Sequence, residues 1–192
     1  MENIDLITNL SYNSYVMTIT KKQVRIWTLR IVLTTLCLLM IGFIISNSLQ
    51  TSVESTKQST TVTDKVQDVA GVVAPDSFVA TATGAAYDKL QSIIRSIAHF
   101  LQFGILGALV VWCYFSWTMQ KKFLFIPFIF MLVFPFFDEF LQNYSSGRAA
   151  EWKDIFLDLS GGASGAVFAL VSVGFVLWLR FRKRQKRLAK TE

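Results

Sequence analysis

The chain has 192 residues, of which 53% are hydrophobic and only 17% are charged. This composition is too apolar for an ordinary soluble domain, and the apolar residues come in long blocks rather than in periodic stripes. The net charge of +6 would suit a nucleic-acid-binding protein, but the basic residues lie in short runs beside the apolar blocks. That placement instead indicates membrane topology and anionic lipid headgroups, so we expect a membrane protein without a nucleic-acid partner.

Four apolar blocks are long enough to cross a membrane, for which a helix needs roughly 20 residues. They cover residues 26–45, 98–117, 123–141 and 159–179. The third block reaches full length only if it includes Asp138 and Glu139. The predicted fold class is all-α, with a single domain over residues 1–192 that forms a bundle of four transmembrane helices.

Basic residues near the ends of these blocks set the predicted orientation, because cytoplasmic loops carry an excess of Lys and Arg. Three basic groups fall on one side of a four-span bundle: Lys21, Lys22 and Arg25 before the first block, Lys121 and Lys122 between the second and third, and the tail over residues 180–192. Both termini are therefore expected in the cytoplasm. The connections over residues 46–97 and 142–158 are expected on the outer side.

The outer connection over residues 46–97 divides into two parts. The first, up to Asp68, is rich in serine and threonine and poor in large apolar residues, which is typical of a solvated loop. The second has leucine and isoleucine at i, i+3, i+4 and i+7 over residues 90–97, the spacing of an amphipathic helix. We expect this helix to lie on the outer leaflet before the second span.

Polar side chains of three predicted helices reach the same depth near the outer side. His99, the only histidine, opens the second block, with Gln102 a turn below it. The others are Asp138, Glu139 and Gln142 at the end of the third block, Arg148 in the following turn, and Asp154 and Asp158 on one face leading into the fourth. Because charges inside hydrocarbon are costly, such residues face the bundle or water, and their convergence indicates a functional site.

The roles within this cluster stay open, since each residue also suits an interfacial position at a helix end. A histidine beside carboxylates suits a general acid or base, a proton relay or a metal ligand. Catalytic roles are predicted for His99, Asp138, Glu139 and Asp154, and substrate contacts for Gln102, Gln142, Arg148 and Asp158. No HExxH, GxSxG or cysteine cluster in the sequence supports a standard hydrolase or zinc site.

Two details of the predicted helices concern packing and side-chain direction. Gly161 and Gly165 have GxxxG spacing, which predicts close approach of the fourth helix to a neighbour. Helical periodicity turns Glu139 by about 100° from Asp138. One of these two acids is therefore expected to face the bundle and the other the membrane interface.

The order of these residues resembles the VanZ-like family of membrane proteins. The stretch "RSIAHFLQFGILG" has a His-Phe pair that opens one helix, and "FDEFLQNYSSGRAAEWKDIFLDLSGGASG" has an Asp-Glu pair, a Gln one turn on, an Arg, an Asp and a glycine-rich helix. The family positions are His99, Asp138, Glu139, Gln142, Arg148 and Asp154. Gln102 stands where many relatives carry an acid, and Asp158 where an Asn is frequent. The resemblance implies a bacterial plasma-membrane protein, and the family's namesake is associated with resistance to the glycopeptide teicoplanin.

The leading functional prediction is action at the outer leaflet on cell-envelope or lipid-linked material, so that glycopeptide susceptibility changes. The alternatives are a membrane enzyme with a His–carboxylate acid–base pair acting on a lipid headgroup or phosphate, and a non-catalytic binding or assembly module. The expected partners are membrane lipids, including a lipid-linked cell-wall precursor. The sequence specifies no cofactor, no metal and no oligomeric state.

Overall fold

The computed structural model describes residues 2–118, 123–147 and 151–189, with side chains from residue 20 onward. These ranges form α1 (Glu2–Ser48), α2 (Ser52–Val73), α3 (Phe78–Thr81), α4 (Ala85–Trp117), α5 (Phe125–Tyr144) and α6 (Trp152–Leu188), and contain no strand. α4, α5, α6 and the part of α1 over Thr20–Ser48 are long and apolar enough to cross a membrane. The prediction of an all-α chain with four candidate spans is confirmed.

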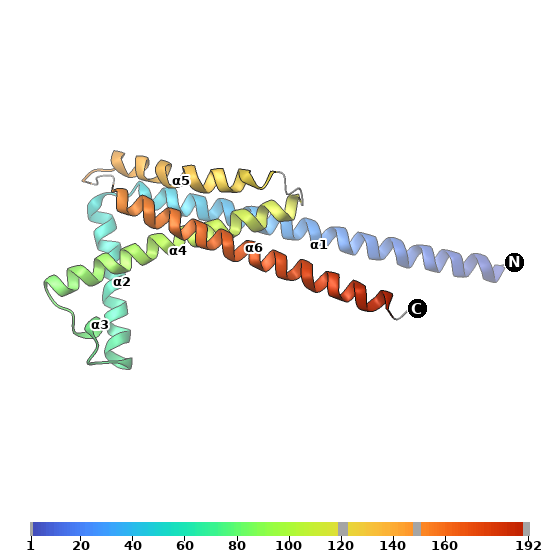
Figure 1. Ribbon diagram of the computed structural model, residues 1–192, viewed down its shortest axis with the longest axis horizontal. Coiled ribbons are helices and arrows are strands. Elements are labelled where there is room, and N and C mark those ends of the chain that lie inside the picture. Colours follow the sequence, from blue (N-terminus) through green and yellow to red (C-terminus); the bar gives the residue numbers. More distant parts are fainter. Residues whose placement is uncertain (1, 119–122, 148–150, 190–192) are drawn as a thin grey trace.

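The four long helices lie alongside one another in an elongated bundle (Figure 1). α4 and α6 run in the same direction, because α5, which lies between them in the sequence, runs back along the bundle in the opposite direction. Both termini project from one end, whereas α2, α3 and the connection between α5 and α6 lie at the opposite end (Figure 1). We call this opposite end the α2 end.

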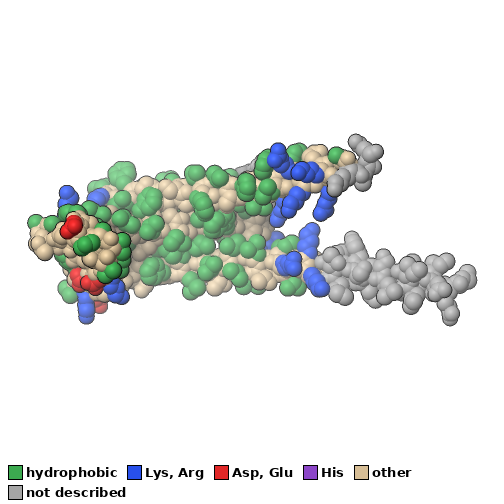
Figure 2. Space-filling view, turned by 90° about the horizontal axis from the view of Figure 1, so that it is seen from below, with side chains coloured by type: hydrophobic (Ala, Val, Ile, Leu, Met, Phe, Trp, Pro, Cys, Tyr) green, Lys and Arg blue, Asp and Glu red, His purple; other side chains and the backbone are tan. Residues whose placement is uncertain are grey.

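The charged side chains gather at the two ends of the bundle. Figure 2 shows Lys and Arg where α1 and α6 project, mixed acidic and basic residues at the α2 end, and hydrophobic side chains between them. Leu39 and Phe168 are among the exposed apolar residues of this middle region. An apolar band between polar ends is typical of a lipid-facing surface. Lys121 and Lys122, the remaining basic group of the predicted orientation, lie outside the described residues.

α4 and α6 pack backbone against backbone at glycine residues. A Cβ atom added to Gly161 would overlap the carbonyl oxygen of Phe100, and one added to Gly165 would overlap that of Gly104. Only hydrogen fits at these two positions, so the helix axes approach more closely than larger residues would allow. The prediction that the GxxxG spacing brings the fourth helix close to a neighbour is confirmed.

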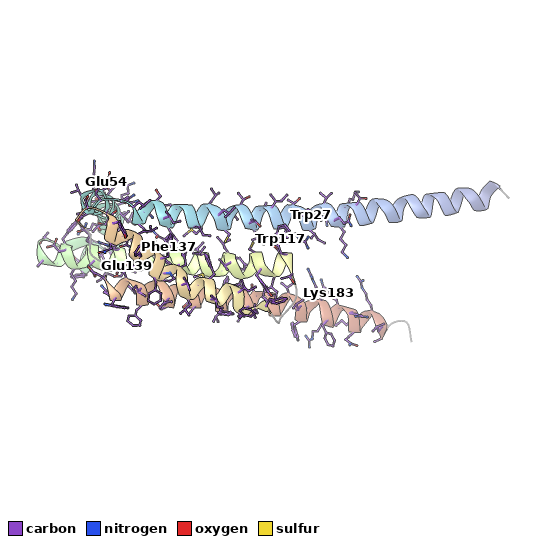
Figure 3. All side chains as sticks on the ribbon, turned by 90° about the horizontal axis from the view of Figure 1, so that it is seen from above. Trp27, Glu54, Trp117, Phe137, Glu139 and Lys183 are labelled. Carbon is purple, nitrogen blue, oxygen red and sulfur yellow. The ribbon has the colours of Figure 1, made fainter. Side chains whose placement is uncertain are left out.

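Arg30 joins α1 to the C-terminal end of α4, at the end of the bundle from which both termini project. Its Nε donates a hydrogen bond of 2.9 Å to the carbonyl oxygen of Ser116, which lies in the last turn of α4. Its guanidinium carbon also lies 5.2 Å from the ring centroids of both Trp27 and Trp117, which are neighbours in Figure 3. The arginine thus satisfies a carbonyl at a helix end, and the two indole rings stabilise its charge.

The serine- and threonine-rich segment, predicted as a solvated loop, instead forms α2, which lies across the end of the bundle (Figure 1). A capping box starts this helix: Glu54 N–H donates to the Thr51 hydroxyl, and Thr51 N–H donates to the Glu54 carboxylate at 2.9 Å. The hydrogen bond from the Thr51 backbone also lowers the pKa of Glu54. The loop prediction is wrong because it weighed composition and missed the cap.

The amphipathic segment predicted as an interfacial helix is the first part of α4, and no helix boundary separates it from the second span. It supports α2 through polar contacts. Gln91 donates hydrogen bonds of 2.8 Å to Ser59 and 2.9 Å to Thr60, and Tyr87 donates one of 2.6 Å to Asp64. The start of α4 therefore holds α2 in place across the bundle.

Replacing Gly165 by alanine should destabilise the protein, because the new methyl group forces α4 and α6 apart. We expect a loss of about 1–3 kcal/mol, the usual cost of overpacking. The measurement is the apparent unfolding midpoint of the detergent-solubilised protein, followed by circular dichroism.

The matched control for this substitution is Gly174→Ala in the same helix, where an added Cβ has no neighbour within 4 Å. Alanine has the higher helix propensity, so the control should be at least as stable as the wild type. Equal midpoints for Gly165→Ala and Gly174→Ala would contradict the backbone contact.

Candidate functional site

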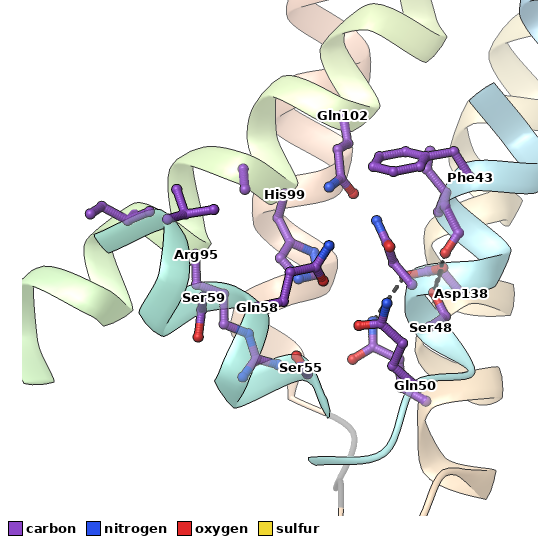
Figure 4. A pocket seen from close by; sticks show the side chains of 16 residues that line it. Phe43, Ser48, Gln50, Ser55, Gln58, Ser59, Arg95, His99, Gln102 and Asp138 are labelled. Atoms are coloured by element: carbon purple, nitrogen blue, oxygen red, sulfur yellow. Dashed lines mark hydrogen bonds between the residues drawn. The ribbon is translucent and has the colours of Figure 1, made fainter. Parts of the chain in front are cut away.

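A cavity of about 260 Å³ lies at the α2 end, between α1, α2, α4 and α5 (Figure 4). Its polar lining includes Ser48 of α1, Gln58 and Ser59 of α2, Arg95, His99 and Gln102 of α4, and Asp138 and Gln142 of α5. A water molecule takes up roughly 30 Å³ in the liquid, so the cavity has room for a polar group of several heavy atoms. The lining combines hydroxyl and amide groups with both signs of charge.

Helix periodicity explains how α4 and α5 present these side chains. Arg95, His99 and Gln102 are spaced i, i+4 and i+7, which places them on one face of α4. Asp138 and Gln142 are spaced i and i+4 on α5. α2 borders the cavity with Ser55, Gln58 and Ser59, as Figure 4 shows.

His99 connects the cavity to α6. Its Nδ1 lies 3.2 Å from Oδ1 of Asp158, whose side chain is fully buried. A carboxylate that contacts one ring nitrogen fixes the orientation of the imidazole. Because Nδ1 is engaged by Asp158, Nε2 is the nitrogen that remains for a ligand in the cavity.

A second pair joins the same two helices one turn nearer the α2 end. The guanidinium of Arg95 lies 4.0 Å from the carboxylate of Asp154. Arg95 and His99 are four residues apart on α4, as are Asp154 and Asp158 on α6, so two parallel helices in register align both pairs. Arg95 is 42% exposed at its side chain, so this pair contributes less to stability than the buried one.

Asp138 holds α5 against α1. Its Oδ1 is hydrogen-bonded to the Ser48 hydroxyl, and its Oδ2 accepts a bond of 2.9 Å from Gln142. Both carboxylate oxygens therefore have partners, although the side chain is only 1% exposed. This arrangement fixes the position of an acid in the cavity wall.

Glu139 is buried as well, at 2% exposure, but it does not line the cavity. Its Oε1 accepts a hydrogen bond from the backbone N–H of Glu151, just before α6. The prediction that one of Asp138 and Glu139 faces the interface is wrong, because α1 covers the first and the start of α6 covers the second. Glu139 Oε2 and Asp158 Oδ2 have no hydrogen-bond partner among the described residues.

The structure thus divides the predicted site residues into two groups. His99, Gln102, Asp138 and Gln142 share the cavity, whereas Glu139, Asp154 and Asp158 lie behind it between α5, α6 and α4. Arg148 lies outside the described residues. Within the described part of the chain, no group of three or more His, Cys, Asp or Glu residues is arranged to hold a metal ion.

Sequence reasoning missed the cavity residues Ser48, Gln58, Ser59 and Arg95. Arg95 had a usable signal, since it lies one turn before His99 on the same helix face. Gln58 and Ser59 follow the Thr51 capping box, which predicts a helix at this position. Ser48 lies in the polar stretch "SNSLQ" after the first span, which resembles the family's exit from that helix, but its contact with Asp138 joins residues 90 positions apart and follows from no local spacing.

A family model described as VanZ/LLP1 matches residues 33–187, which is most of the chain. No curated protein and no solved structure matches significantly. The matched range includes every residue that lines the cavity and both pairs that join α4 to α6.

Replacing His99 by alanine should destabilise the protein strongly, because it leaves the buried carboxylate of Asp158 without its partner. Breaking a buried pair in this way costs about 3–5 kcal/mol. In the double variant His99→Ala/Asp158→Ala the uncompensated charge is gone, so part of this loss should be recovered. The unfolding midpoints of the single and double variants test this.

Arg95→Ala serves as the control, because the more exposed pair should contribute less than about 1 kcal/mol. A double variant as unstable as the sum of its two single variants would show that His99 and Asp158 do not interact.

Proposed function

The chain belongs to the VanZ/LLP1 family of membrane proteins, and from this premise we propose that its cavity binds the polar headgroup of lipid-linked cell-envelope material. Binding takes place at the outer face of a bacterial plasma membrane, with both termini in the cytoplasm. It changes susceptibility to glycopeptides of the teicoplanin type. The basic residues at the termini support this orientation, since Lys and Arg are enriched on the cytoplasmic side.

The observation that carries the proposal is the position and lining of the cavity. It lies at the end of the four spans, where lipid headgroups lie, and not near their middle. Gln58 and Gln102 offer donors and acceptors that suit a sugar or an amide, and Arg95 offers a positive charge that suits a phosphate. A transport site would instead be expected near the midplane.

A second candidate function, acid–base catalysis on the bound headgroup, is favoured by the His99–Asp158 pair. General bases are commonly oriented by a further group, and Asp158 holds the ring at 3.2 Å while the ring lines the cavity. Nε2 of His99 then exchanges the proton with the ligand. Asp158 acts as a positioning residue, because it does not line the cavity.

Binding is tested with the variants Gln58→Leu and Gln102→Leu, which keep the size of the side chains but remove their hydrogen bonds. Each should return glycopeptide susceptibility to that of cells without the protein, at unchanged abundance. Each should also lower the envelope lipid that copurifies with the protein roughly tenfold, as expected for a lost hydrogen bond of about 1.5 kcal/mol. Lipid mass spectrometry gives the second measurement.

Asp68→Leu of α2 is the matched control, because this exposed residue lies outside the cavity lining. Wild-type susceptibility and wild-type lipid content in both cavity variants would contradict the proposed binding. Reduced abundance without any change in bound lipid per molecule would favour the assembly module, in which the polar residues only stabilise the bundle.

Catalysis is tested by incubating purified protein with the lipid that copurifies and following its conversion by mass spectrometry. His99→Gln, which keeps hydrogen-bonding capacity but cannot act as the base, should lower the rate by about 10²–10⁴-fold. Absence of turnover by the wild-type protein would leave binding as the function of the cavity.

A further inference from the structure

Three hollows follow one another along the face where α4 meets α6, outside the cavity. The outer hollow, about 210 Å³, is polar; the middle hollow, about 260 Å³, is mixed; and the apolar hollow, about 390 Å³, lies deepest in the bundle. The outer and middle hollows share Ser92, Ser96 and Lys153, and the middle and apolar hollows share Phe100. The three hollows therefore adjoin one another in a row, which we call the trough.

The apolar hollow is long enough for a lipid hydrocarbon chain. Its floor is formed where Gly104 and Gly165 bring the two helices together, and Ile105 and Phe168 form its rims. From Phe100 to Trp112 it spans twelve residues of α4, or about 18 Å at 1.5 Å per residue. This is about the depth of one leaflet, half of a hydrocarbon core of about 30 Å.

Lys153 supplies a positive charge above the apolar hollow. It lines both the middle and the outer hollow, its side chain is exposed, and it forms no ion pair with the part of the chain that the structure describes. A cation directly above a site for a lipid chain lies where the phosphate of that lipid would be.

The outer hollow adds a group of carboxylates beyond Lys153. Asp88 of α4 and Glu151 and Asp154 at the start of α6 line it together with Arg95 and Lys153. Arg95 pairs with Asp154, whereas neither Asp88 nor Glu151 forms an ion pair within the described ranges. From the membrane outward, the trough therefore presents an apolar surface, then Lys153, and then an outer hollow where Asp88 and Glu151 form no ion pair with the described residues and Arg95 is paired with Asp154.

We propose that this trough binds one aminophospholipid, a glycerophospholipid whose headgroup carries a primary ammonium. One hydrocarbon chain lies in the apolar hollow, the phosphate lies beside Lys153, and the ammonium donates hydrogen bonds to the carboxylates of the outer hollow. The order of the three chemical groups in the lipid matches the order of the three hollows. This site is separate from the headgroup cavity of the proposed function and does not depend on it.

Two other membrane lipids match the trough less well. Phosphatidylglycerol has the phosphate and the chains, but no cation for the carboxylates of Asp88 and Glu151. Phosphatidylcholine has the same charges as phosphatidylethanolamine, but its quaternary ammonium has no N–H to donate. A comparison of these three lipids therefore separates the contributions of charge and hydrogen bonding.

The test is native mass spectrometry of the full chain, reconstituted into vesicles with equal amounts of phosphatidylethanolamine, phosphatidylglycerol and phosphatidylcholine and then released into mild detergent. The wild-type protein should retain one phosphatidylethanolamine molecule in at least about threefold preference, as expected for partly exposed charged contacts. Asp88→Asn/Glu151→Gln should remove this preference while keeping phospholipid bound. Lys153→Gln should lower retention of all three lipids.

A matched pair of substitutions places the lipid in the trough. Ser164→Phe fills the apolar hollow from an exposed position on α6 and should abolish retention, whereas Ala163→Phe, also exposed but outside the lining, should not. Circular dichroism confirms that each variant is folded. Equal retention of the three lipids by the wild-type protein, or equal losses in Ser164→Phe and Ala163→Phe, would overturn the proposal.

The cavity variant Gln102→Leu should retain phosphatidylethanolamine as the wild type does, because Gln102 does not line the trough. Wild-type susceptibility in the cavity variants, together with selective retention of phosphatidylethanolamine by the wild-type protein, would confine failure to the headgroup cavity. Lost glycopeptide effects in the cavity variants, together with equal retention of the three lipids by the wild-type protein, would confine failure to the trough.

Discussion

The close contact between the backbones of α4 and α6 sets the geometry on which the rest of the structure depends. At Gly161 and Gly165 the two helices meet without intervening side chains, so their relative rotation and height have little freedom. Just above this contact, His99 meets Asp158 and Arg95 meets Asp154. A shift of one helix by a single residue, about 1.5 Å along its axis, would separate both pairs. The glycines therefore position the ionisable residues as well as packing the helices.

The buried carboxylates at the α2 end are stabilised by five different kinds of partner. Asp138 has a hydroxyl and an amide, Glu139 a backbone N–H, Asp154 a guanidinium and Asp158 an imidazole. Each acid fastens its helix to another helix or to a helix start, so the set connects α1, α4, α5 and α6. Such residues are tolerated in a membrane protein where they face the protein interior, and these do. At the same end, α2 is joined to α4 through the polar side chains of Gln91 and Tyr87.

The sequence predicted the features that follow from local patterns. Apolar block length gave the four spans, GxxxG spacing gave the close contact of α6, and topology brought the helix ends that carry His99 and Asp138 to one level. The sequence did not predict features that depend on contacts between residues far apart in the chain. Periodicity of α5 alone could not show that the start of α6 covers Glu139. The serine- and threonine-rich composition of residues 52–68 indicated a loop. The helix α2 is instead stabilised by the Thr51 cap and by contacts with Gln91 and Tyr87 of α4.

Arg95 and Ser59 separate the headgroup cavity from the trough on the α4–α6 face, since both line the cavity and the outer hollow. Arg95 is paired with Asp154 at 4.0 Å, and the Ser59 hydroxyl accepts a hydrogen bond of 2.8 Å from Gln91. The same two side chains belong to both sites, so a substitution at Arg95 alters the lining of the cavity and of the trough together. Polar contacts at the two sites therefore cannot be varied independently at Arg95, whereas Gln102 lines only the cavity and Ser164 only the apolar hollow.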